Sequence, residues 1–456
     1  MKTILVPVFD GMVARNLLYT DVIQTLIKNG GIRVVIVPPN GKADYYQSQF
    51  ADGKNIFVDK TLFWRKSTSQ FVFEKLFLHS IPTNFMHIRQ VDWYWNKGKH
   101  ITYAGVSILR TLGHFHFWHH LLRFFDSLVP VPKYLEDIMD TWQPDMVFAP
   151  TMIARDEVAL MRLARRRDKK TIGMFKSWDN PTSKAFLRFF PDAIIAHTEI
   201  MKQEAIALYG YPAERIFVTG VPQFDAYAHP DFIEPRESFF KKIGADSNKK
   251  LITFAPAGDW MTLYDKEILE YILDWIDVGK LPNCQVLLRL HPAYESKTEE
   301  LAGRAHLVIE RPGKHFEGVD KNATLKSVEF DLGEIRHLGS TMKWSSVTIN
   351  TASTLVIESA IFDTPVVLLG FDGDKKLSYW KSVCRYYDRE HFVPIVRSGG
   401  APMVKSKEEL LRALLNYLED SKLHHEGRVL IQGEQGYDSQ GHAGEKVAQV
   451  LLRALA

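Results

Sequence analysis

Residues 4–37, with the sequence ILVPVFDGMVARNLLYTDVIQTLIKNGGIRVVIV, decide the fold class. The apolar run at 4–8 is typical of a short buried β-strand. Apolar residues then recur at helical spacing between Leu17 and Ile27, and Gly30-Gly31 ends this pattern before a second apolar run at 32–37. The stretch therefore predicts a strand–helix–strand unit, which belongs to a parallel sheet covered by helices on both faces.

The same alternation repeats along the chain in two series. We expect helices at 156–167, 266–276, 354–362 and 407–418, and strands at 146–149, 171–175, 193–197, 216–219, 251–255, 285–290, 307–310, 347–350 and 365–370. The pattern predicts an α/β protein with two tandem Rossmann-like doubly wound domains, at 1–225 and 245–440, and a C-terminal helix at 441–456. Ligands of such sheets bind beyond the carboxyl ends of the strands, so two facing sheets are expected to form one cleft.

The composition is that of an ordinary globular protein. The 456 residues are 46% hydrophobic and 24% charged, and a net charge of +3 gives no overall field that favours nucleic acid. The two cysteines, Cys284 and Cys384, point to a reducing compartment and leave no four-cysteine zinc site. The first apolar run is too short for a secretory signal, and no stretch reaches the ~18 apolar residues of a membrane span. We expect a cytoplasmic protein, with the inner face of the cell membrane as an allowed location.

Residues 60–140 interrupt the alternation and are interpreted as an insertion in the first domain. Residues 60–125 hold nine Lys or Arg against Glu74 and Asp92, together with Trp64, Trp93, Trp95, Trp118 and many phenylalanines. Basic residues among aromatic ones suit a membrane interface or an anionic acceptor such as a lipid-linked phosphate. A helical subdomain with an aromatic core and solvated charges explains the composition equally well. Nucleic acid is not expected, because no recognition motif accompanies the charge.

Residues that can carry chemistry follow two strands of the second domain. His291-Pro292 follows the strand expected at 285–290, and Thr351-Ala352-Ser353-Thr354 leads from the strand at 347–350 into a helix that carries Glu358. Hydroxyl residues at a helix start offer donors to an anion, and a nucleotide phosphate is the candidate. Arg289 or His291 would add a charge-assisted bond to that phosphate, and Glu358 would accept from ribose hydroxyls.

Each of these features also has a purely structural explanation. Ser353 or Thr354 would cap the helix, and His291-Pro292 would end a strand and start a turn. Their occurrence together, at the ends of neighbouring strands in the second half, favours a binding site.

The second half resembles the donor domain of glycosyltransferases with the GT-B fold. Arg289-Leu290-His291-Pro292 is similar to the His-Pro motif, and residues 351–354 to the serine motif, of bacterial sialyltransferases and related enzymes with cytidine-nucleotide donors. In those families both motifs contact the donor phosphate and cytidine. Residues 217–225, FVTGVPQFD, and 252–256, ITFAP, also resemble the domain junction of CDP-glycerol glycerophosphotransferases and of nonhydrolysing UDP-N-acetylglucosamine 2-epimerases.

Two departures from these families keep the donor open. Asn350 stands where the CDP-glycerol enzymes tend to have an acidic residue, and the retaining-type pair of glutamates eight positions apart is absent. The chain also lacks a Walker-type loop, a Gly-x-Gly-x-x-Gly and a His-Glu-x-x-His motif, which argues against an ATPase, a dinucleotide oxidoreductase and a zinc hydrolase.

The first domain offers two candidates for the base that activates an acceptor hydroxyl. Asp10 follows the first strand, and Asp179 follows the strand at 171–175. Burial against Phe9 or Trp178 is expected to raise the carboxyl pKa to a useful value. Asp10 is preferred as the base and Asp179 as an acceptor-binding or structural group, although both also suit turns. Arg15 is expected to bind an anionic acceptor or to be solvated.

No metal site is expected. Asp372-Gly373-Asp374 matches the Asp-x-Asp pattern that holds a divalent ion in the other large glycosyltransferase fold, but two acids beside glycine more often form a surface turn. His116 and His120 are one helical turn apart, and no third ligand accompanies them.

The resemblance and the motifs together predict a metal-independent glycosyltransferase without a cofactor. It would move a sugar from a CMP-, CDP- or UDP-linked donor on the second domain to a surface-polysaccharide or lipid-linked acceptor on the first. The alternatives are a UDP-N-acetylglucosamine 2-epimerase-like isomerase, which needs no acceptor surface, a CDP-glycerol glycerophosphotransferase, and a non-catalytic nucleotide-sugar binding protein.

Overall fold

The computed structural model describes residues 1–61, 68–184, 186–316 and 328–456. These residues form two compact units. Unit 1 comprises Met1–Ala226, Phe316–Glu329 and Asp438–Ala456, and unit 2 comprises Tyr227–His315 and Phe330–Tyr437. Trp64 and the rest of 62–67 lie outside the described residues. The expected α/β architecture with two tandem sheets is confirmed.

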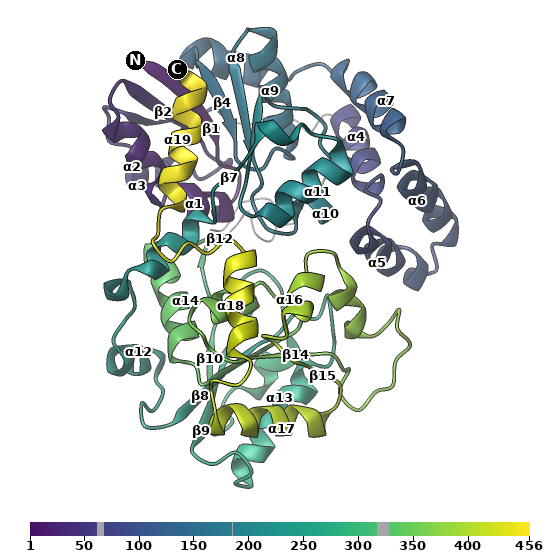
Figure 1. Ribbon diagram of the computed structural model, residues 1–456, viewed down its shortest axis with the longest axis vertical. Coiled ribbons are helices and arrows are strands. Elements are labelled where there is room, and N and C mark those ends of the chain that lie inside the picture. The colour runs from purple at the N-terminus through teal and green to yellow at the C-terminus, as the bar shows by residue number, and fades with distance from the viewer. Residues whose placement is uncertain (62–67, 185, 317–327) are drawn as a thin grey trace. The chain divides into compact units, whose positions relative to one another are not determined.

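Unit 1 is built on a parallel sheet that, in the described residues, has the order β3-β2-β1-β4-β5-β6-β7 (Figure 1). The strands are β1 (Lys2–Pro7), β2 (Ile32–Val37), β3 (Ile56–Val58), β4 (Met146–Ala149), β5 (Lys170–Met174), β6 (Ala193–Ala196) and β7 (Ile216–Val218). The helices around it are α1 (Gly11–Leu17), α2 (Asp21–Lys28), α3 (Ala43–Phe50), α8 (Lys133–Trp142), α9 (Arg155–Arg166), α10 (Asn180–Ser183), α11 (Glu199–Tyr209) and α19 (Ala443–Leu455).

The alternation of side chains along β1 divides the core of unit 1 into two layers. Ile4 and Val6 join a buried cluster with residues of α1, α2 and α19, whereas Leu5 joins a second cluster with residues of α8, α9 and α11. Because successive side chains of a strand point to opposite faces, helices must cover both faces of this sheet. The strand–helix–strand prediction for 4–37 is confirmed: β1 and β2 are parallel and pair from Lys2 with Ile32 to Pro7 with Val37.

The last helix, α19, belongs to unit 1 although unit 2 precedes it in the chain. The Asp225 carboxylate accepts the backbone N–H groups of Ala443 (3.1 Å) and Gly444 (2.7 Å) at the start of this helix. Val447, Ala448 and Leu451 then pack into the cluster that contains α2. The sequence pattern predicted this helix but not its location.

The described part of the insertion is helical, as expected. It consists of α4 (Thr68–His79), α5 (Asn84–Trp93), α6 (His100–Leu112) and α7 (His116–Ser127). Phe77 and Leu122 anchor α4 and α7 to the cluster around α9. In Figure 1 these four helices lie together at one edge of unit 1. In the described residues no helix has the length and apolar character needed to cross a bilayer.

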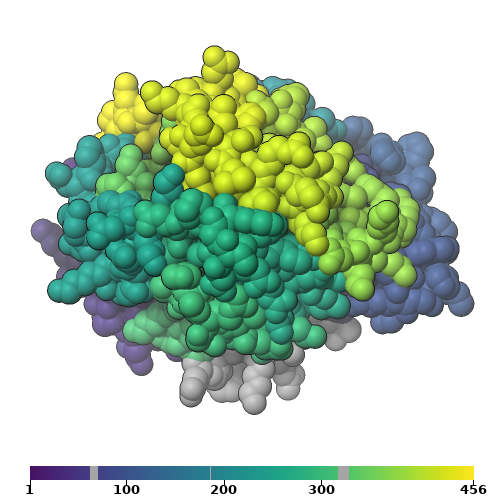
Figure 2. Space-filling model, turned by 90° about the horizontal axis from the view of Figure 1, so that it is seen from below, coloured from purple at the N-terminus to yellow at the C-terminus, as the bar shows by residue number. Residues whose placement is uncertain are grey.

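Unit 2 contains a second parallel sheet, with the order β10-β9-β8-β13-β14-β15 in the described residues. The strands are β8 (Lys250–Ala255), β9 (Cys284–Arg289), β10 (Leu307–Glu310), β13 (Val347–Asn350), β14 (Val366–Leu369) and β15 (Met403–Val404). The helices are α12 (Arg236–Ile243), α13 (Asp265–Asp277), α14 (Leu332–Trp344), α15 (Leu355–Ile361), α16 (Val393–Ser398), α17 (Lys407–Glu419) and α18 (His425–Glu434). Figure 2 shows the segment of α17 beside the segment of α13 on the surface of this unit, and both helices pack into one core.

Candidate functional site

In a doubly wound sheet, ligands bind at the carboxyl edge, where the strand order reverses. In unit 2 the order reverses between β8 and β13, and in unit 1 between β1 and β4. The residues expected to bind a donor follow β9 and β13, and those expected to act on an acceptor follow β1 and β5. Both sets therefore lie at the carboxyl edge of their own sheet, on strands at or next to the switch point.

His291, shortly after β9, is neutral at pH 7. Its Nδ1 accepts the backbone N–H groups of Ala293 (3.0 Å) and Tyr294 (3.2 Å), which leaves the ring proton on Nε2. Burial lowers the pKa of the imidazole to about 4, and the nearby Arg311 guanidinium acts in the same direction. The ring therefore offers an uncharged N–H donor, and a bond to phosphate is charge-assisted only through the phosphate.

Arg289, the last residue of β9, is part of a buried network of ion pairs and hydrogen bonds. Its guanidinium forms an ion pair with the Glu310 carboxylate, which also bonds Nε2 of His337 at 2.7 Å. Burial alone raises the pKa of Glu310, but Arg289 and His337 outweigh it and lower the pKa to about 2. The structure therefore places Arg289 against Glu310 rather than beside His291, where the sequence analysis expected it to help bind a phosphate.

The turn between β13 and α15 has a strained backbone. Ala352 has a φ of +44°, a conformation that costs a residue other than glycine about 1–3 kcal/mol. The buried Tyr387 holds this turn: its hydroxyl accepts the Ala352 N–H at 3.3 Å and donates to the Leu369 carbonyl at 2.7 Å. Backbone strain held by a buried side chain is a feature that clusters at ligand-binding sites.

The hydroxyl residues of this turn are only partly explained by helix capping. Ser353 Oγ accepts the N–H of Leu355 at 3.3 Å, which is the capping bond that the structural explanation anticipates. Thr354 is exposed and makes no side-chain capping bond to α15, whereas Thr351 is buried. Glu358 lies one turn into α15 and is buried as well. The Ser353 and Thr354 side chains are thus the ones that the turn presents to solvent.

The loops after β8, β9 and β13 follow neighbouring strands, since β8 pairs with both β9 and β13. The Asp265 carboxylate accepts the N–H groups of Ala257 (2.8 Å) and Gly258 (3.3 Å) in the loop after β8. Gly258 packs so closely on Tyr294, in the loop after β9, that an added Cβ would lie 3.0 Å from the Tyr294 Cβ. Asp265 also interacts electrostatically with Tyr387, which holds the loop after β13. The loops that carry His291 and Ser353 therefore lie at one edge of the sheet.

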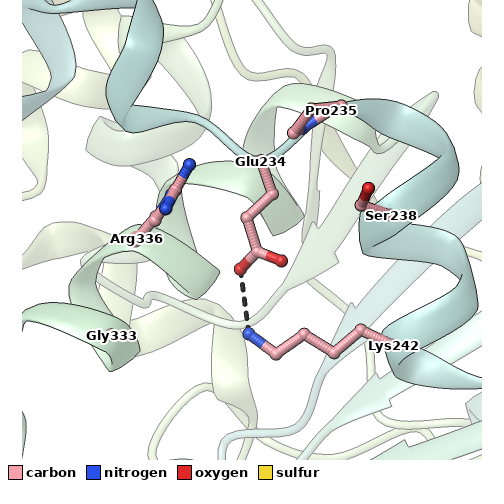
Figure 3. Close-up of a pocket in the computed structure, with 6 residues that line it drawn as sticks. All are labelled: Glu234, Pro235, Ser238, Lys242, Gly333 and Arg336. Atoms are coloured by element: carbon pink, nitrogen blue, oxygen red, sulfur yellow. Dashed lines mark hydrogen bonds and ion pairs between the residues drawn. The ribbon is translucent and has the colours of Figure 1, made fainter.

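Two pockets of unit 2 lie near α12 and α14, and one of them reaches the end of β10. One has a volume of about 470 Å³ and is lined by residues that include Arg289, Glu310 and Arg311. Arg311 also donates to the His291 carbonyl at 3.0 Å, so one lining residue of this pocket bonds the His291 loop. The other, of about 450 Å³, is shown in Figure 3, where Glu234 and Lys242 form an ion pair of 2.8 Å. We assign no ligand to that second pocket.

In unit 1, Asp10 forms an ion pair at the end of β1. Its Oδ2 lies 2.9 Å from Nζ of Lys176, and its Oδ1 accepts the N–H of Val13 at the start of α1. Burial acts to raise the pKa of Asp10, as the sequence analysis expected, but Lys176 and the backbone donors outweigh it and the pKa is lowered. The expectation of a raised pKa is wrong because Lys176, two residues beyond β5, was not recognised as a partner.

Two buried carboxyl groups flank Asp10. Burial raises the pKa of Glu157 to about 8, although Oε2 accepts the backbone N–H and the hydroxyl of Thr151 after β4. Burial also raises the pKa of Glu329, which bonds Nζ of Lys42 at 2.7 Å and the hydroxyl of Tyr46 at 3.0 Å. Asp10 repels both groups electrostatically. The acids at the switch point of unit 1 are thus stabilised in two ways. Lys176 and Lys42 form ion pairs with Asp10 and Glu329, and the raised pKa of Glu157 favours its protonated form.

Asp179 and Arg15 lie in the same unit but have different partners. Asp179 accepts from Ser183 at 2.7 Å and pairs with Lys184 at 3.3 Å, at the start of the short helix α10. Arg15, on α1, donates from Nε to Gln223 at 2.6 Å. Asp179 also interacts electrostatically with Lys176, the ion-pair partner of Asp10.

The motifs considered for metal binding have structural partners. Asp372 accepts the N–H of Val383 at 3.0 Å, and Asp374 pairs with Lys407 at 3.5 Å. No group of three or more His, Cys, Asp or Glu suited to a metal occurs in the residues that the structure describes. Both Cys284 and Cys384 are free thiols.

Four residues of these edges were not predicted from the sequence: Arg311, Asp265, Tyr387 and Lys176. Lys176 and Arg311 follow predicted strands directly, so their position was a usable signal. Asp265 bonds the loop just before its own helix and Tyr387 bonds a turn 35 residues earlier, and the sequence pattern indicates neither contact.

The comparisons with known proteins agree with this architecture. The sequence profile of the family described as CDP-Glycerol:Poly(glycerophosphate) glycerophosphotransferase matches residues 165–453, more than half of the chain. Among curated proteins, no sequence matches. The S. aureus MnaA–UDP structure has a TM-score of 0.55 at 13% sequence identity, and the matched region covers 98% of this chain and 94% of the MnaA chain. UDP-GlcNAc 2-epimerase from Neisseria meningitidis, bound to UDP-GlcNAc, has a TM-score of 0.55 at 14% sequence identity, and the matched region covers 99% of this chain and 100% of the epimerase chain. A glycosyltransferase from Rickettsia africae has a TM-score of 0.51 at 13% identity, with 99% of both chains covered.

Proposed function

Because this chain belongs to the CDP-glycerol:poly(glycerophosphate) glycerophosphotransferase family, we propose that it transfers a group from a nucleotide-activated donor to a hydroxyl of a surface-polysaccharide or lipid-linked acceptor. The transferred group is a glycosyl unit or, as the family match favours, a glycerophosphoryl unit from a CDP-linked donor. The solved structures with a similar fold include both a glycosyltransferase and nucleotide-sugar epimerases.

One observation carries the donor site: the loops after β8, β9 and β13 follow adjacent paired strands at the switch point of unit 2, and the first two are in close contact. We propose that Nε2–H of His291 and the hydroxyls of Ser353 and Thr354 bind the phosphates of the donor. Fixed donors at this position would stabilise the charge that develops on the departing nucleotide. Arg289 supports the site indirectly, since its ion pair with Glu310 fixes the end of β9 beside Arg311.

On unit 1 we propose that Asp10 binds the acceptor hydroxyl and accepts its proton. Its lowered pKa keeps it ionised at neutral pH, so it can receive a hydrogen bond from the acceptor in the ground state. Lys176 positions the carboxylate and is a positioning residue rather than a catalytic one. Asp179 is proposed as an acceptor-binding group, with Arg15 as a site for anionic parts of the acceptor.

The proposed place of action is the cytoplasmic face of the cell membrane. A lipid-linked or growing surface polymer is found there, and the basic, aromatic composition of the insertion suits contact with it. The donor reaction itself needs no membrane, so the chemistry and the location can be tested separately.

A panel of nucleotides and donors tests the proposal. CMP, CDP, UDP and GDP are compared by thermal shift, because a ligand at a hundred times its Kd stabilises a protein by about 2.7 kcal/mol. CDP-glycerol and CDP- or UDP-linked sugars are then incubated with a polyol or saccharide acceptor, and nucleotide release is measured. Acceptor-dependent release supports the transferase. Epimerisation of UDP-N-acetylglucosamine without any acceptor would instead show an isomerase, and binding without turnover across the panel would show a binding protein.

A further inference from the structure

The loop after β14 carries exposed basic and aromatic side chains that the proposed reaction does not use. Residues 375–381, which we call the lysine loop, have the sequence KKLSYWK, with three lysines and no acid. Lys375, Lys376 and Lys381 are exposed, and Tyr379 and Trp380 are 40% and 36% exposed. In the part of the chain that the structure describes, none of these three lysine side chains forms an ion pair or a hydrogen bond. Their charges are therefore available to a partner outside the chain.

Hydrogen bonds hold the backbone of the lysine loop at both ends. Asp372 forms a short antiparallel bridge with Lys375, and its carboxylate accepts the N–H of Val383 at 3.0 Å, beyond the other end of the loop. Within the loop, the N–H of Lys381 bonds the Ser378 carbonyl at 2.9 Å. The exposed side chains therefore project from a defined turn.

The acids next to the lysine loop already have partners. Asp374 pairs with Lys407 at 3.5 Å, and Asp388 accepts the hydroxyl of Tyr379 at 2.5 Å. That bond also holds the Tyr379 ring, against which the Trp380 ring packs edge to face, with the ring centroids 5.0 Å apart. The loop thus combines a local excess of positive charge with two rings in a defined arrangement.

The lysine loop lies at the edge of the sheet to which we assign the donor. Strand β14 pairs in parallel with β13, so the loops that follow the two strands leave the same edge of unit 2. The 3-10 helix η6 (Val383–Asp388) comes directly after the lysine loop and carries Tyr387, whose hydroxyl bonds the Ala352 turn. A short stretch of chain thus links the lysine loop to the turn that carries Ser353.

We propose that the lysine loop binds the phosphodiester chain of a growing acceptor polymer, outside the reaction site. A glycerol phosphate polymer carries one negative charge per repeat, and ammonium groups on flexible stems pair with such charges without requiring a fixed spacing. The rings of Tyr379 and Trp380 contact the carbon atoms between successive phosphates. The inference rests on the proposed function for the identity of the polymer, and it adds a second place on the chain that holds it.

Other anionic partners suit the lysine loop less well. A bilayer surface is not favoured, because the two rings are the only large apolar side chains exposed in this loop and one of them is held by a hydrogen bond to Asp388. A nucleic acid would need ring faces on which successive bases stack. The edge-to-face packing of Tyr379 and Trp380 does not offer two parallel faces.

Direct binding tests the lysine loop without any turnover. A fluorescein-labelled dimer and a labelled decamer of glycerol phosphate are titrated with the full-length protein, and fluorescence anisotropy gives the Kd at several salt concentrations. A labelled single strand of DNA with ten nucleotides is titrated in the same way. The loop variant combines Lys375→Gln, Lys376→Gln and Lys381→Gln.

The matched control removes the same charge elsewhere in unit 2. It combines Lys280→Gln, Lys343→Gln and Lys422→Gln, at lysines that are all exposed. Lys280 and Lys343 shortly precede β9 and β13, so they lie at the amino edge of the sheet, opposite to the lysine loop. Circular dichroism establishes that both variants are folded.

The unaltered protein is expected to bind the decamer more tightly than the dimer, because three lysines engage more than two phosphates. The loop variant should lose at least about tenfold in affinity for the decamer. Its plot of log K against log salt concentration should be shallower by about 2, since each contact to a single-stranded phosphodiester contributes about 0.7 to the slope. The control should bind the decamer within about twofold of the unaltered protein.

Two binding results overturn the inference. The loop variant binds the decamer as tightly as the control does, or the DNA strand binds more tightly than the decamer and loses that affinity in the loop variant, which would show a nucleic-acid site.

Nucleotide release separates this inference from the proposed reaction. With CDP-glycerol and free glycerol as an uncharged acceptor, all three proteins should release CMP at the same rate. No release from any donor, together with lysine-dependent binding of the decamer, would overturn the proposed reaction and support the loop assignment. Release with the decamer as acceptor at an unchanged KM in the loop variant would support the reaction and overturn the loop assignment.

Discussion

Nζ of Lys176 lies 2.9 Å from a carboxylate oxygen of Asp10, so a residue at the end of β5 sets the ionisation of a residue at the end of β1. These two strands flank β4 in the sheet of unit 1. The pairing lowers the pKa of Asp10 against the effect of its burial.

Replacement of Lys176 by methionine is expected to raise the pKa of Asp10, because the burial remains when the cation is gone. If Asp10 accepts the proton of the acceptor, the acid limb of the kcat/KM profile should move to higher pH by at least about one unit. Lys184→Met is the matched control, since Lys184 pairs with Asp179. A shift in the control variant and none in Lys176→Met would make Asp179 the base.

The buried Glu157 should make the stability of the protein fall as the pH rises. Its pKa is raised from 4.5 to about 8, so its protonated form is favoured in the folded state. Stability is therefore complete below about pH 4.5 and is lost as the pH rises towards 8, by about 1.4 kcal/mol per pH unit in that window. Glu157→Gln keeps an acceptor for Thr151 and should remove this dependence. Urea unfolding of both proteins at several pH values measures it, and parallel pH profiles would contradict the prediction.

Tyr387→Phe should impair donor binding through the turn that it holds. The variant loses the hydroxyl that bonds the Ala352 N–H, and about 1 kcal/mol of stability with it. Tyr417→Phe is the control, because Tyr417 is equally buried in unit 2 and its hydroxyl bonds His424 at 2.8 Å. Both variants should lose similar stability, but only Tyr387→Phe should weaken CDP binding, by about tenfold. Equal nucleotide affinities in the two variants would remove Tyr387 from the site.

His291 should contribute to nucleotide binding without any pH dependence near neutrality. Its pKa of about 4 means that the ring is neutral both at pH 5.5 and at pH 8. Calorimetry measures the Kd for CDP of His291→Gln and of the unaltered protein. The ratio of the two values should stay at about five across this pH range. The ratio cancels the titration of the nucleotide itself. A ratio that grows steadily below pH 6.5 would show a protonated ring and a different tautomer arrangement.

The sequence predicted the sheets well because their signals are local. The strands at 32–37, 146–149, 307–310 and 347–350 are observed at the predicted residues, and the other predicted strands differ by one or two residues at their ends; the short strands β3 and β15 were not predicted. Continuous apolar runs that alternate with helical patterns are typical of a parallel sheet covered by helices on both faces, so the parallel arrangement followed from this pattern.

The candidate sites were only partly predictable, because their electrostatics depend on distant partners. The position of His291 at a strand end was visible in the sequence, but its neutral state depends on burial and on Arg311, twenty residues later. The ionisation of Asp10 depends on Lys176, 166 residues away. Arg289 was expected to face a phosphate, and the alternative partner Glu310 became evident only when β9 and β10 were seen to pair. A strand pattern specifies where a side chain lies along its own strand and gives no information about which charge faces it.

The affinity of CDP for four proteins tests the central claim most directly: the unaltered chain, His291→Ala, Ser353→Ala and Ser406→Ala. Ser406 caps α17 by accepting the N–H of Glu409, so its replacement reproduces the loss of a capping serine at a helix that we do not assign to the site. We predict that His291→Ala and Ser353→Ala each weaken CDP binding by at least about fivefold and that Ser406→Ala leaves it unchanged. A Kd that stays the same in both His291→Ala and Ser353→Ala would contradict the assignment of the donor to this edge of the second sheet.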